Sequence, residues 1–362
     1  MAPEPAEKGL TSAGARPPWE GHVSTSMTLV VRLAWGLGDV LLSTSAIRRY
    51  KELNPDAPIV FQTYKHNRTD RYSLEYEKGC PAEMLYGNPD IDAIIDWFEP
   101  HPAPALVREL RYAWFGGPSL DYPIQAHFWE NLGLEWTPNQ RFDAFYCLTG
   151  PERQAASRLL PGDGGPYLVI APHTGWPGKA WTEEGWSELI SLALTKGLAP
   201  VVLSGVPLKG PPWDQRGVIN LSGRLDIRAS AGVLDRAEYA VLLEGGLSNL
   251  RFALSRPAIL LTCATGIGLQ IWTPPEITTE IRMMSHALHE HLSEPEIVPG
   301  IDRLQGYARV ACEPCMWRRE HVTNGAHDRH VPPASIKRCP PGRSLRDIPA
   351  SVVMTALEGE SG

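Results

Sequence analysis

The sequence predicts an α/β protein in which mainly parallel sheets are covered by helices. Short apolar runs typical of buried strands alternate with segments whose apolar residues recur at helical spacing, and both halves of the chain show this alternation. Glycine-containing turns follow several of the apolar runs, as expected where a strand leads directly into a helix. A length of 362 residues is enough for two such units.

The first unit is predicted to begin with the apolar run Thr28–Leu33, which is typical of a buried strand. A helix is expected from Val40 to Tyr50, ending before Asn54 and Pro55, because the residue before a proline is rarely helical. The remaining elements are expected as strands at Ile59–Gln62 and Ala93–Trp97 and a helix at Pro123–Leu134.

The second unit is predicted to begin after the turn-forming run of residues 162–166. Tyr167–Ala171 is typical of a strand, and the helix that starts near Glu183 carries apolar residues at i, i+3, i+4, i+7 and i+8. Beyond about Gly300 the chain is rich in Cys, His and Pro, which favours irregular structure. The other expected elements are strands at Val201–Leu203, Tyr239–Leu243 and Ala258–Leu261 and helices at Asn249–Leu254 and Ile348–Leu357.

These patterns divide the chain into four segments. Residues 1–26 are rich in Pro, Ala, Gly and Ser and lack the apolar core of a signal peptide, so we expect a disordered tail there. We expect an N-terminal unit at residues 27–161 and a C-terminal unit at 162–340. Residues 341–362 are expected to form a last helix and tail.

Composition excludes several classes of protein. The 34 Lys and Arg against 41 Asp and Glu give a net charge of −7, which argues against a general nucleic-acid binder. The longest uncharged apolar stretch, Pro257–Pro274, is too short and too polar to span a bilayer. Six Cys are too few for a disulfide scaffold in a chain of this length, so the expected location is the cytoplasm, with reduced thiols.

The turn after the first strand contains Gly36, Gly38 and Asp39, without the third glycine of a dinucleotide-binding fingerprint. Asp39 is expected at the carboxyl edge of a parallel sheet, where ligands of open α/β folds bind and a carboxylate can accept a proton from a hydroxyl. The alternative is that Asp39 only caps the following helix.

Two turns of the second unit could hold a phosphate. Residues 172–181 include Thr174 and Lys179, a hydroxyl and a cation suited to a diphosphate leaving group, although Lys179 could also be a solvated surface charge. In the turn of residues 244–249, the pair Gly245 and Gly246 lets backbone N–H groups approach an anion at a helix N-terminus. The alternative for that turn is a tight turn capped by Ser248.

In this order the turns resemble glycosyltransferase family 9, best known for ADP-heptose:lipopolysaccharide heptosyltransferases, and the resemblance covers Thr28–Cys339. Members carry a Gly-Asp-Val turn, a Lys-x-Trp segment, an Asn-Leu-Ser/Thr-Gly run and an Asp-Ser/Thr-Gly-x-x-His turn followed by Ala-Leu-x-x-Pro. The corresponding residues here are 38–40, 179–181, 220–223, 244–249 and 253–257.

The resemblance implies the GT-B fold, in which two Rossmann-like domains face each other across a cleft, with sugar nucleotide on the C-terminal domain and acceptor on the N-terminal one. It implies transfer with inversion and no metal cofactor for catalysis, with Asp39 as general base and Lys179 neutralising the leaving diphosphate. The expected donor site comprises Thr174, Gly175, Lys179, Glu244, Gly245, Gly246, Leu247 and Ser248.

The third turn departs from the family pattern at two positions. Glu244 stands where members usually have Asp, and Asn249 stands where they usually have His. The longer acid and the lost imidazole bear on the donor sugar and on catalysis itself.

The acceptor is expected to be a carbohydrate or glycolipid held by Gly38 and by the basic segment that contains Lys65, Arg68 and Arg71. Guanidinium and ammonium groups suit an anionic acceptor such as a phosphorylated sugar, and the alternative for this segment is a solvated loop. Contact with a membrane surface would be peripheral.

Cys312 and Cys315, with Cys339 further on, have the ligand types of a structural zinc or iron site. Three Cys need a fourth ligand, and spacing does not choose among the intervening His residues. The alternative is a loop of reduced thiols.

The favoured function is therefore an inverting transferase that moves a sugar, by resemblance heptose from ADP-heptose, to a glycoconjugate. Two rivals are a sugar-nucleotide epimerase or hydrolase on the same fold and a non-catalytic glycan-binding protein, since a fold does not fix a function.

Overall fold

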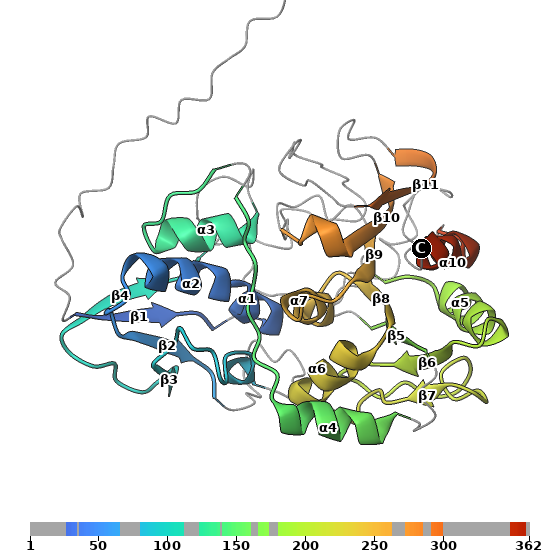
Figure 1. Ribbon diagram of the computed structural model, residues 1–362, viewed down its shortest axis with the longest axis horizontal. Helices are drawn as coiled ribbons and strands as arrows, with labels where there is room; N and C mark the ends of the chain where they lie inside the picture. The colour runs from blue at the N-terminus through green and yellow to red at the C-terminus, as the bar shows by residue number, and fades with distance from the viewer. Residues whose placement is uncertain are drawn as a thin grey trace, which may run out of the picture.

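Figure 1 shows the computed structural model of the chain. The strands that the structure describes form one sheet of four strands and one of seven. Parallel pairing dominates both sheets, which confirms the predicted α/β class. The structure describes residues 27–34, 36–65, 80–111, 123–137, 140–160, 166–173, 180–262, 272–284, 291–299 and 348–359.

The N-terminal sheet has the strand order β3-β2-β1-β4, and all its pairs are parallel. Because β1 lies inside the sheet, its carboxyl end opens onto the middle of the sheet edge. The strands are β1 (Thr28–Arg32), β2 (Ile59–Thr63), β3 (Ala93–Asp96) and β4 (Ala105–Glu109). The helices are α1 (Leu37–Leu42), α2 (Thr44–Leu53), the 3₁₀ turn η1 (Pro81–Met84) and α3 (Ile124–Asn131).

Helices α2 and α3 lie together on one face of this sheet (Figure 1). Alternate strand residues such as Leu29, Val31 and Phe61 are fully buried in the core between them, as the two-residue period of a strand requires. Trp129 of α3 packs edge-on against Phe142, with ring centroids 5.2 Å apart.

The single helix predicted from Val40 to Tyr50 is two helices in the structure, and that prediction is wrong in this respect. Ser43 separates α1 from α2. The hydroxyls of Ser43, Thr44 and Ser45 donate to the carbonyls of residues 40, 41 and 42, each three positions earlier, at 2.7, 2.6 and 3.0 Å. Side-chain bonds of this kind compete with the helical ladder and break it locally.

The C-terminal sheet has the order β11-β10-β9-β8-β5-β6-β7, and only β11 runs antiparallel to its neighbour among the described strands. The position of β8 and β5 in the centre places the turns that follow them at the middle of the carboxyl edge. The strands are β5 (Tyr167–Ala171), β6 (Ala199–Val202), β7 (Ile219–Asn220), β8 (Tyr239–Leu243), β9 (Ala258–Thr262), β10 (Thr278–Met284) and β11 (His291–Pro299).

Helices cover both faces of this sheet (Figure 1). Along β5, Val169 faces the core beside α6 and α7, whereas Leu168 and Ile170 face the core beside α5 and α10. The helices are α4 (Gly150–Leu159), α5 (Glu183–Thr195), α6 (Ile227–Arg236), α7 (Gly246–Ala253), the 3₁₀ turn η4 (Pro275–Ile277) and α10 (Ala350–Gly359).

Helix α4 precedes the predicted start of the C-terminal unit, yet it packs along α6 of that unit. Gly232 allows this close approach, because a Cβ there would stand 2.8 Å from the Cβ of Ala156. A capping box starts α4, since Thr149 Oγ1 accepts from Glu152 N while the Glu152 carboxylate accepts from Thr149 N.

A reciprocal pair of hydrogen bonds joins α3 to the segment that precedes η4, and thereby the two parts of the chain. The Gln125 amide donates to the Trp272 carbonyl at 2.9 Å and accepts from the Trp272 N–H at 3.1 Å. Nearby, Arg141 forms an ion pair with Glu276 at 2.6 Å. Among the described residues, no helix has the length and apolar character needed to cross a bilayer.

Candidate functional site

The candidate site lies where the first turns of α1 and α7 meet, in the middle of Figure 1. Each helix follows a strand of a different sheet, α1 after β1 and α7 after β8. The carboxyl edges of the two sheets therefore meet at this point, and carboxyl edges are where open α/β sheets bind ligands.

Glycines make the contact between the two helices. A Cβ on Gly38 would stand 2.7 Å from Asn249 Nδ2 and 3.5 Å from Gly246 Cα. No side chain larger than hydrogen fits at Gly38 unless Asn249 moves. The sequence placed Gly38 in an acceptor site, and the structure gives it a second, packing role at the border of the two units.

Asp39 is the third residue of α1 and is partly exposed beside this contact. The N-cap is Gly36, so Asp39 is not the N-cap residue that the alternative interpretation required. A carboxylate in the first turn of a helix is favoured by the helix dipole in its ionised form. The structure thus places this carboxyl group where one sheet edge faces the other.

Glu244 ends β8 at the opposite side of the contact and is 6% exposed. It precedes Gly245, the N-cap of α7. Ser248 fixes this cap, because its hydroxyl accepts from Gly245 N at 3.0 Å and donates to Gly245 O at 2.9 Å. The capping alternative for Ser248 is therefore correct, and it leaves the first backbone N–H groups of α7 without an intrahelical acceptor.

Asn249, which stands where family members usually carry His, is 4% exposed and packs against Gly38. Its backbone N–H donates to Gly245 O at 3.1 Å. The buried side chain fills space between α7 and α1, so this departure from the family pattern falls on the contact itself.

The turn that carries Thr174, Gly175 and Lys179 lies outside the described residues, but both its ends are described. It leaves the sheet after β5, whose Ala171 is in register with Leu242 of the neighbouring β8. The far end is anchored by Trp181, which is 4% exposed, packs edge-on to Trp186 at 4.8 Å and donates to Ile348 O at 3.1 Å. The turn thus starts beside that of Glu244.

The Asn-Leu-Ser-Gly run fixes a loop on the same sheet. The Asn220 amide donates to Asp214 Oδ1 at 2.7 Å and to Leu208 O at 2.8 Å, and its oxygen accepts from Ser222. Gly223 has φ +63°, and its Cβ position is within 2.6 Å of Pro207, so a glycine is required there. This run shapes the loop after β6.

On the N-terminal sheet, Lys65 follows β2 and lies 3.7 Å from Glu99 as an ion pair, while its backbone N–H donates to Asp96 at 3.1 Å. Arg68 and Arg71 lie outside the described residues. Around Lys65 the sequence reasoning missed an aromatic group, in which Arg32 stacks on Trp97 at 4.3 Å and Tyr64 packs 5.7 Å from Trp97.

The predicted metal ligands Cys312, Cys315 and Cys339 lie outside the described residues. Within the part that the structure describes, no group of three His, Cys, Asp or Glu side chains could hold a metal ion. The two described cysteines, Cys80 and Cys147, are free thiols, and burial raises the pKa of Cys80.

Sequence reasoning also missed Arg228, which joins the parts away from the site. Its guanidinium bonds both oxygens of Glu152 at 2.6 and 2.8 Å, the Cys147 carbonyl at 2.8 Å and the Glu83 carbonyl at 3.1 Å. It also lies 4.8 Å from the Tyr146 ring. A capping-box pattern at Thr149 was visible in the sequence, but no sequence signal identifies its long-range partner.

Burial and charge shift the pKa values around Arg228 in opposite directions. Burial tends to raise the pKa of Glu152, but hydrogen bonds from Arg228 and Thr149 outweigh it, so the pKa falls. Burial, with Asp226 nearby, raises the pKa of Glu83. The group therefore holds one stabilised carboxylate and one whose ionisation is disfavoured.

Comparison with known proteins shows what part of the chain is similar to. Residues 125–269 match the family model described as glycosyltransferase family 9 (heptosyltransferase). Lipopolysaccharide heptosyltransferase 1 of Escherichia coli K12 is 31% identical over 118 residues, which are 30% of this chain and 36% of that protein. The Salmonella typhimurium protein of the same name is 32% identical over 108 residues, 29% of this chain and 34% of that one. The chain thus spans about a third of the length of these curated relatives.

Solved structures share the fold over more of the chain. The glycosyl transferase family 9 structure from Veillonella parvula has a TM-score of 0.59 and 14% identity, covering 92% of this chain and 97% of that one. The iron-containing dodecameric glycosyltransferase TibC from enterotoxigenic E. coli has a TM-score of 0.52 and 18% identity, covering 68% and 61%. The fold is GT-B. The family match over residues 125–269, the curated relatives and the shared fold together support a heptosyltransferase-like protein that is similar to glycosyltransferase family 9.

Proposed function

We propose that the chain transfers a sugar from a nucleotide-sugar donor to a carbohydrate or glycoconjugate acceptor, with heptose from ADP-heptose as the favoured donor. The observation that carries this proposal is the contact between α1 and α7, which places the Asp39 turn against the Glu244–Ser248 turn. The proposed general base for the acceptor and the N–H groups proposed to bind the donor diphosphate would then face the same space.

In the proposed reaction Asp39 is the general base that takes the proton from the acceptor hydroxyl. The acceptor oxygen then attacks the anomeric carbon from the side opposite to the nucleotide, so the configuration at that carbon inverts. The partly exposed carboxylate of Asp39 supports this role, because the base must reach an acceptor that arrives from solvent.

The leaving diphosphate is proposed to lie at the N-terminus of α7, where the N–H groups of Gly246 and Leu247 point away from the helix. Thr174 and Lys179 would complete this site from the turn after β5, whose first residues are adjacent to those of β8. These groups supply the charge stabilisation that the departing diphosphate needs, so we assign no metal to the reaction. For Cys312, Cys315 and Cys339 we propose a structural zinc or iron site, on ligand type alone.

The acceptor is proposed to enter on the N-terminal side, with Lys65, Arg68 and Arg71 binding its anionic groups. One curated relative is named for lipopolysaccharide, and a TibC structure is described as a complex with ADP-D-β-D-heptose, at a TM-score of 0.50. These names guide the first substrates to test here. We place the reaction in the cytoplasm, at the membrane surface if the acceptor is a glycolipid.

The first experiment is a thermal-shift panel of the purified protein with ADP, UDP, GDP, dTDP and CDP, because a ligand that binds only the folded state raises its melting temperature. We expect ADP to give the largest shift, and Lys179→Ala to remove most of it. Equal shifts from all five nucleotides, or none from any, would count against the donor assignment.

The second experiment separates transfer from the rival reactions. Release of ADP from ADP-heptose is measured with and without a lipopolysaccharide-precursor acceptor. Transfer requires release that depends on the acceptor. Acceptor-independent release would indicate a hydrolase, and binding without release would indicate a glycan-binding protein.

A further inference from the structure

A hollow of about 500 Å³ lies at the opposite edge of the C-terminal sheet from the candidate site. Ala237 and Glu238 precede β8 there, and Arg256 and Pro257 precede β9, so the hollow opens at the amino ends of these strands. Since β8 alone has five residues, about 16 Å of strand separates this edge from Glu244.

Arg251 forms the rigid floor of the hollow. It is fully buried, and its guanidinium donates to the carbonyls of Pro257 at 2.9 Å, Ala237 at 3.0 Å and Leu234. These carbonyls include the open C-terminal end of α6, which Arg251 therefore caps. The N–H donors of Arg251 bond carbonyls within the protein, so Arg251 gives the hollow positive charge and a fixed shape.

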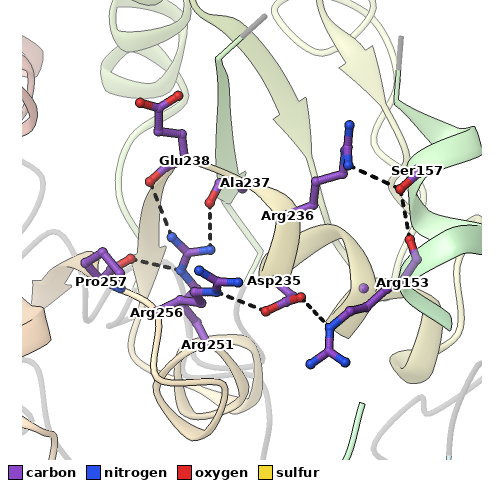
Figure 2. A pocket seen from close by; sticks show the side chains of 10 residues that line it. Arg153, Ser157, Asp235, Arg236, Ala237, Glu238, Arg251, Arg256 and Pro257 are labelled. Atoms are coloured by element: carbon purple, nitrogen blue, oxygen red, sulfur yellow. Dashed lines mark hydrogen bonds and ion pairs between the residues drawn. The ribbon is translucent and has the colours of Figure 1, made fainter. Parts of the chain in front are cut away.

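Three further arginines surround the hollow, and Figure 2 shows how the protein holds them. Asp235 accepts from Arg153 Nε at 2.9 Å and from Arg256 Nε at 3.0 Å. Arg236 donates through one Nη to Ser157 at 3.3 Å. The three guanidiniums are thus oriented before any ligand arrives, which lowers the entropy that binding must pay.

The way these arginines are held leaves their outer N–H groups available. Arg256 uses only Nε, and Arg153 uses Nε and one Nη, the latter on Leu148 O. Within the described residues no acceptor engages the other Nη groups of these two side chains. The arrangement presents forked N–H donors of the kind that bind tetrahedral oxyanions.

The charge in the hollow is positive although the chain as a whole carries −7. Arg153, Arg236 and Arg256 face the single carboxylate of Asp235, and in Figure 2 the Glu238 carboxylate points away from the guanidiniums. Burial disfavours ionisation of Asp235, but hydrogen bonds from Arg153 and Arg256 outweigh it and lower its pKa. Asp235 is therefore a fixed counter-ion that offsets one of these three arginine charges, and the buried Arg251 adds a further positive charge.

We propose that this hollow binds a phosphate-type dianion through Arg153, Arg236 and Arg256. The same chemistry is offered by a free phosphorylated small molecule and by a phosphomonoester lipid headgroup. The site is separate from the proposed donor site, and the inference does not depend on the transferase reaction.

The test is a calorimetric titration with inorganic phosphate, largely a dianion at pH 7.5, at low salt and on the full chain. We expect saturable binding that weakens as salt rises, and Arg256→Gln and Arg153→Gln to weaken it about tenfold each, since each removes charge-assisted hydrogen bonds. Arg158→Gln is the matched control, because Arg158 is exposed on the same helix as Arg153 and does not line the hollow. Circular dichroism checks that each variant is folded.

The titration is repeated with Lys179→Ala, which removes the cation of the proposed donor turn, and binding in the hollow is expected to persist. No binding by the wild type, or equal loss in Arg158→Gln and Arg256→Gln, would overturn the proposal. Co-sedimentation with vesicles of phosphatidylcholine, with and without phosphatidic acid, distinguishes the sources. Retention that needs both phosphatidic acid and Arg256 identifies a headgroup, and phosphate binding without retention identifies a soluble phosphate.

Discussion

Two of the described contacts between the N-terminal and C-terminal parts of this protein differ in the groups that make them. At the candidate site, α1 meets α7 through Gly38 and Gly246, with the buried amide of Asn249 between them. Away from the site, Arg228 of α6 holds Glu152, Cys147 and Glu83 through a partly buried guanidinium. The contact at the candidate site is made mainly by glycine backbone, and the other is made by one charged side chain, that of Arg228.

This difference between the two contacts predicts that one affects catalysis and the other affects stability. A contact made by glycines brings two helix N-termini together beside Asp39 and the first N–H groups of α7. A contact made by a bidentate ion pair and two carbonyls fixes the parts but offers nothing further to a ligand, because its donors are used. We therefore expect changes at the first contact to affect turnover and changes at the second to affect unfolding.

The largest expected effect is that of Asp39→Asn on turnover. Loss of a general base lowers the rate by about 10²–10⁴-fold, while ADP affinity and the melting temperature stay close to those of the wild type. Steady-state transfer from ADP-heptose and a calorimetric ADP titration measure the two quantities. The exposed Asp56→Asn is the control. Wild-type turnover in Asp39→Asn would remove the residue from the mechanism.

Arg228→Ala is expected to lower the free energy of unfolding by about 3 kcal/mol, because it leaves Glu152 and two carbonyls without their donor. Turnover below the melting temperature should change little. Urea denaturation measures the loss. Arg49→Ala, which breaks an ion pair with both partners exposed by more than 40%, should cost less than about 0.5 kcal/mol. Similar losses in the two variants would contradict the assigned role of Arg228.

Gly38→Ala tests the first contact directly. The added Cβ would meet Asn249 Nδ2 at 2.7 Å, so we expect a loss of about 1–2 kcal/mol, together with reduced turnover as α1 shifts from α7. Asn249→Ala in the same chain should recover part of the stability, since it removes the clashing atom. Gly150→Ala, where nothing lies within 4 Å of the added Cβ, is the matched control. A Gly38→Ala protein as stable as that control would show that the contact is loose.

A smaller effect concerns pH. The folded pKa of Glu152 is lowered, so its ionisation stabilises the fold above its unfolded pKa of about 4.3, and this stabilisation is lost as pH falls through the folded value. Glu152→Gln should therefore be less stable than the wild type at pH 7 and approach it in stability near pH 3. Thermal melts across this range measure the gap. A gap that stays constant with pH would mean that the charge of Glu152 contributes nothing.

Local patterns were enough to predict most strands and the α/β class, because a five-residue apolar run such as Tyr167–Ala171 has few other stable environments. The family motifs also identified the turns around Asp39 and Glu244. Elements whose sequence is mixed, such as β4 and α6, were not predicted, although Asp226 caps α6 in the usual way. The break at Ser43 was missed because three successive hydroxyls act together there.

The contacts between the parts could not be predicted from the sequence, for a physical reason. Gly38 and Asn249 are more than 200 positions apart, so only the packing of the two sheets decides that these residues meet. The hydrogen bonds of Arg228 likewise depend on how α4 lies along α6. The roles of Thr174, Lys179 and the cysteines stay predictions, since those residues lie outside the described part.

The packing of α10 against two buried tryptophans affects the fluorescence of the protein. Val353, Met354 and Leu357 of α10 are buried in the same core as the Trp181–Trp186 pair, and Trp181 donates to the chain just before α10. Indoles in such a dry setting fluoresce at shorter wavelengths than indoles in water. Because Trp181 also closes the turn of Thr174 and Lys179, the emission difference between the wild type and Trp181→Phe reports whether that turn and α10 are docked.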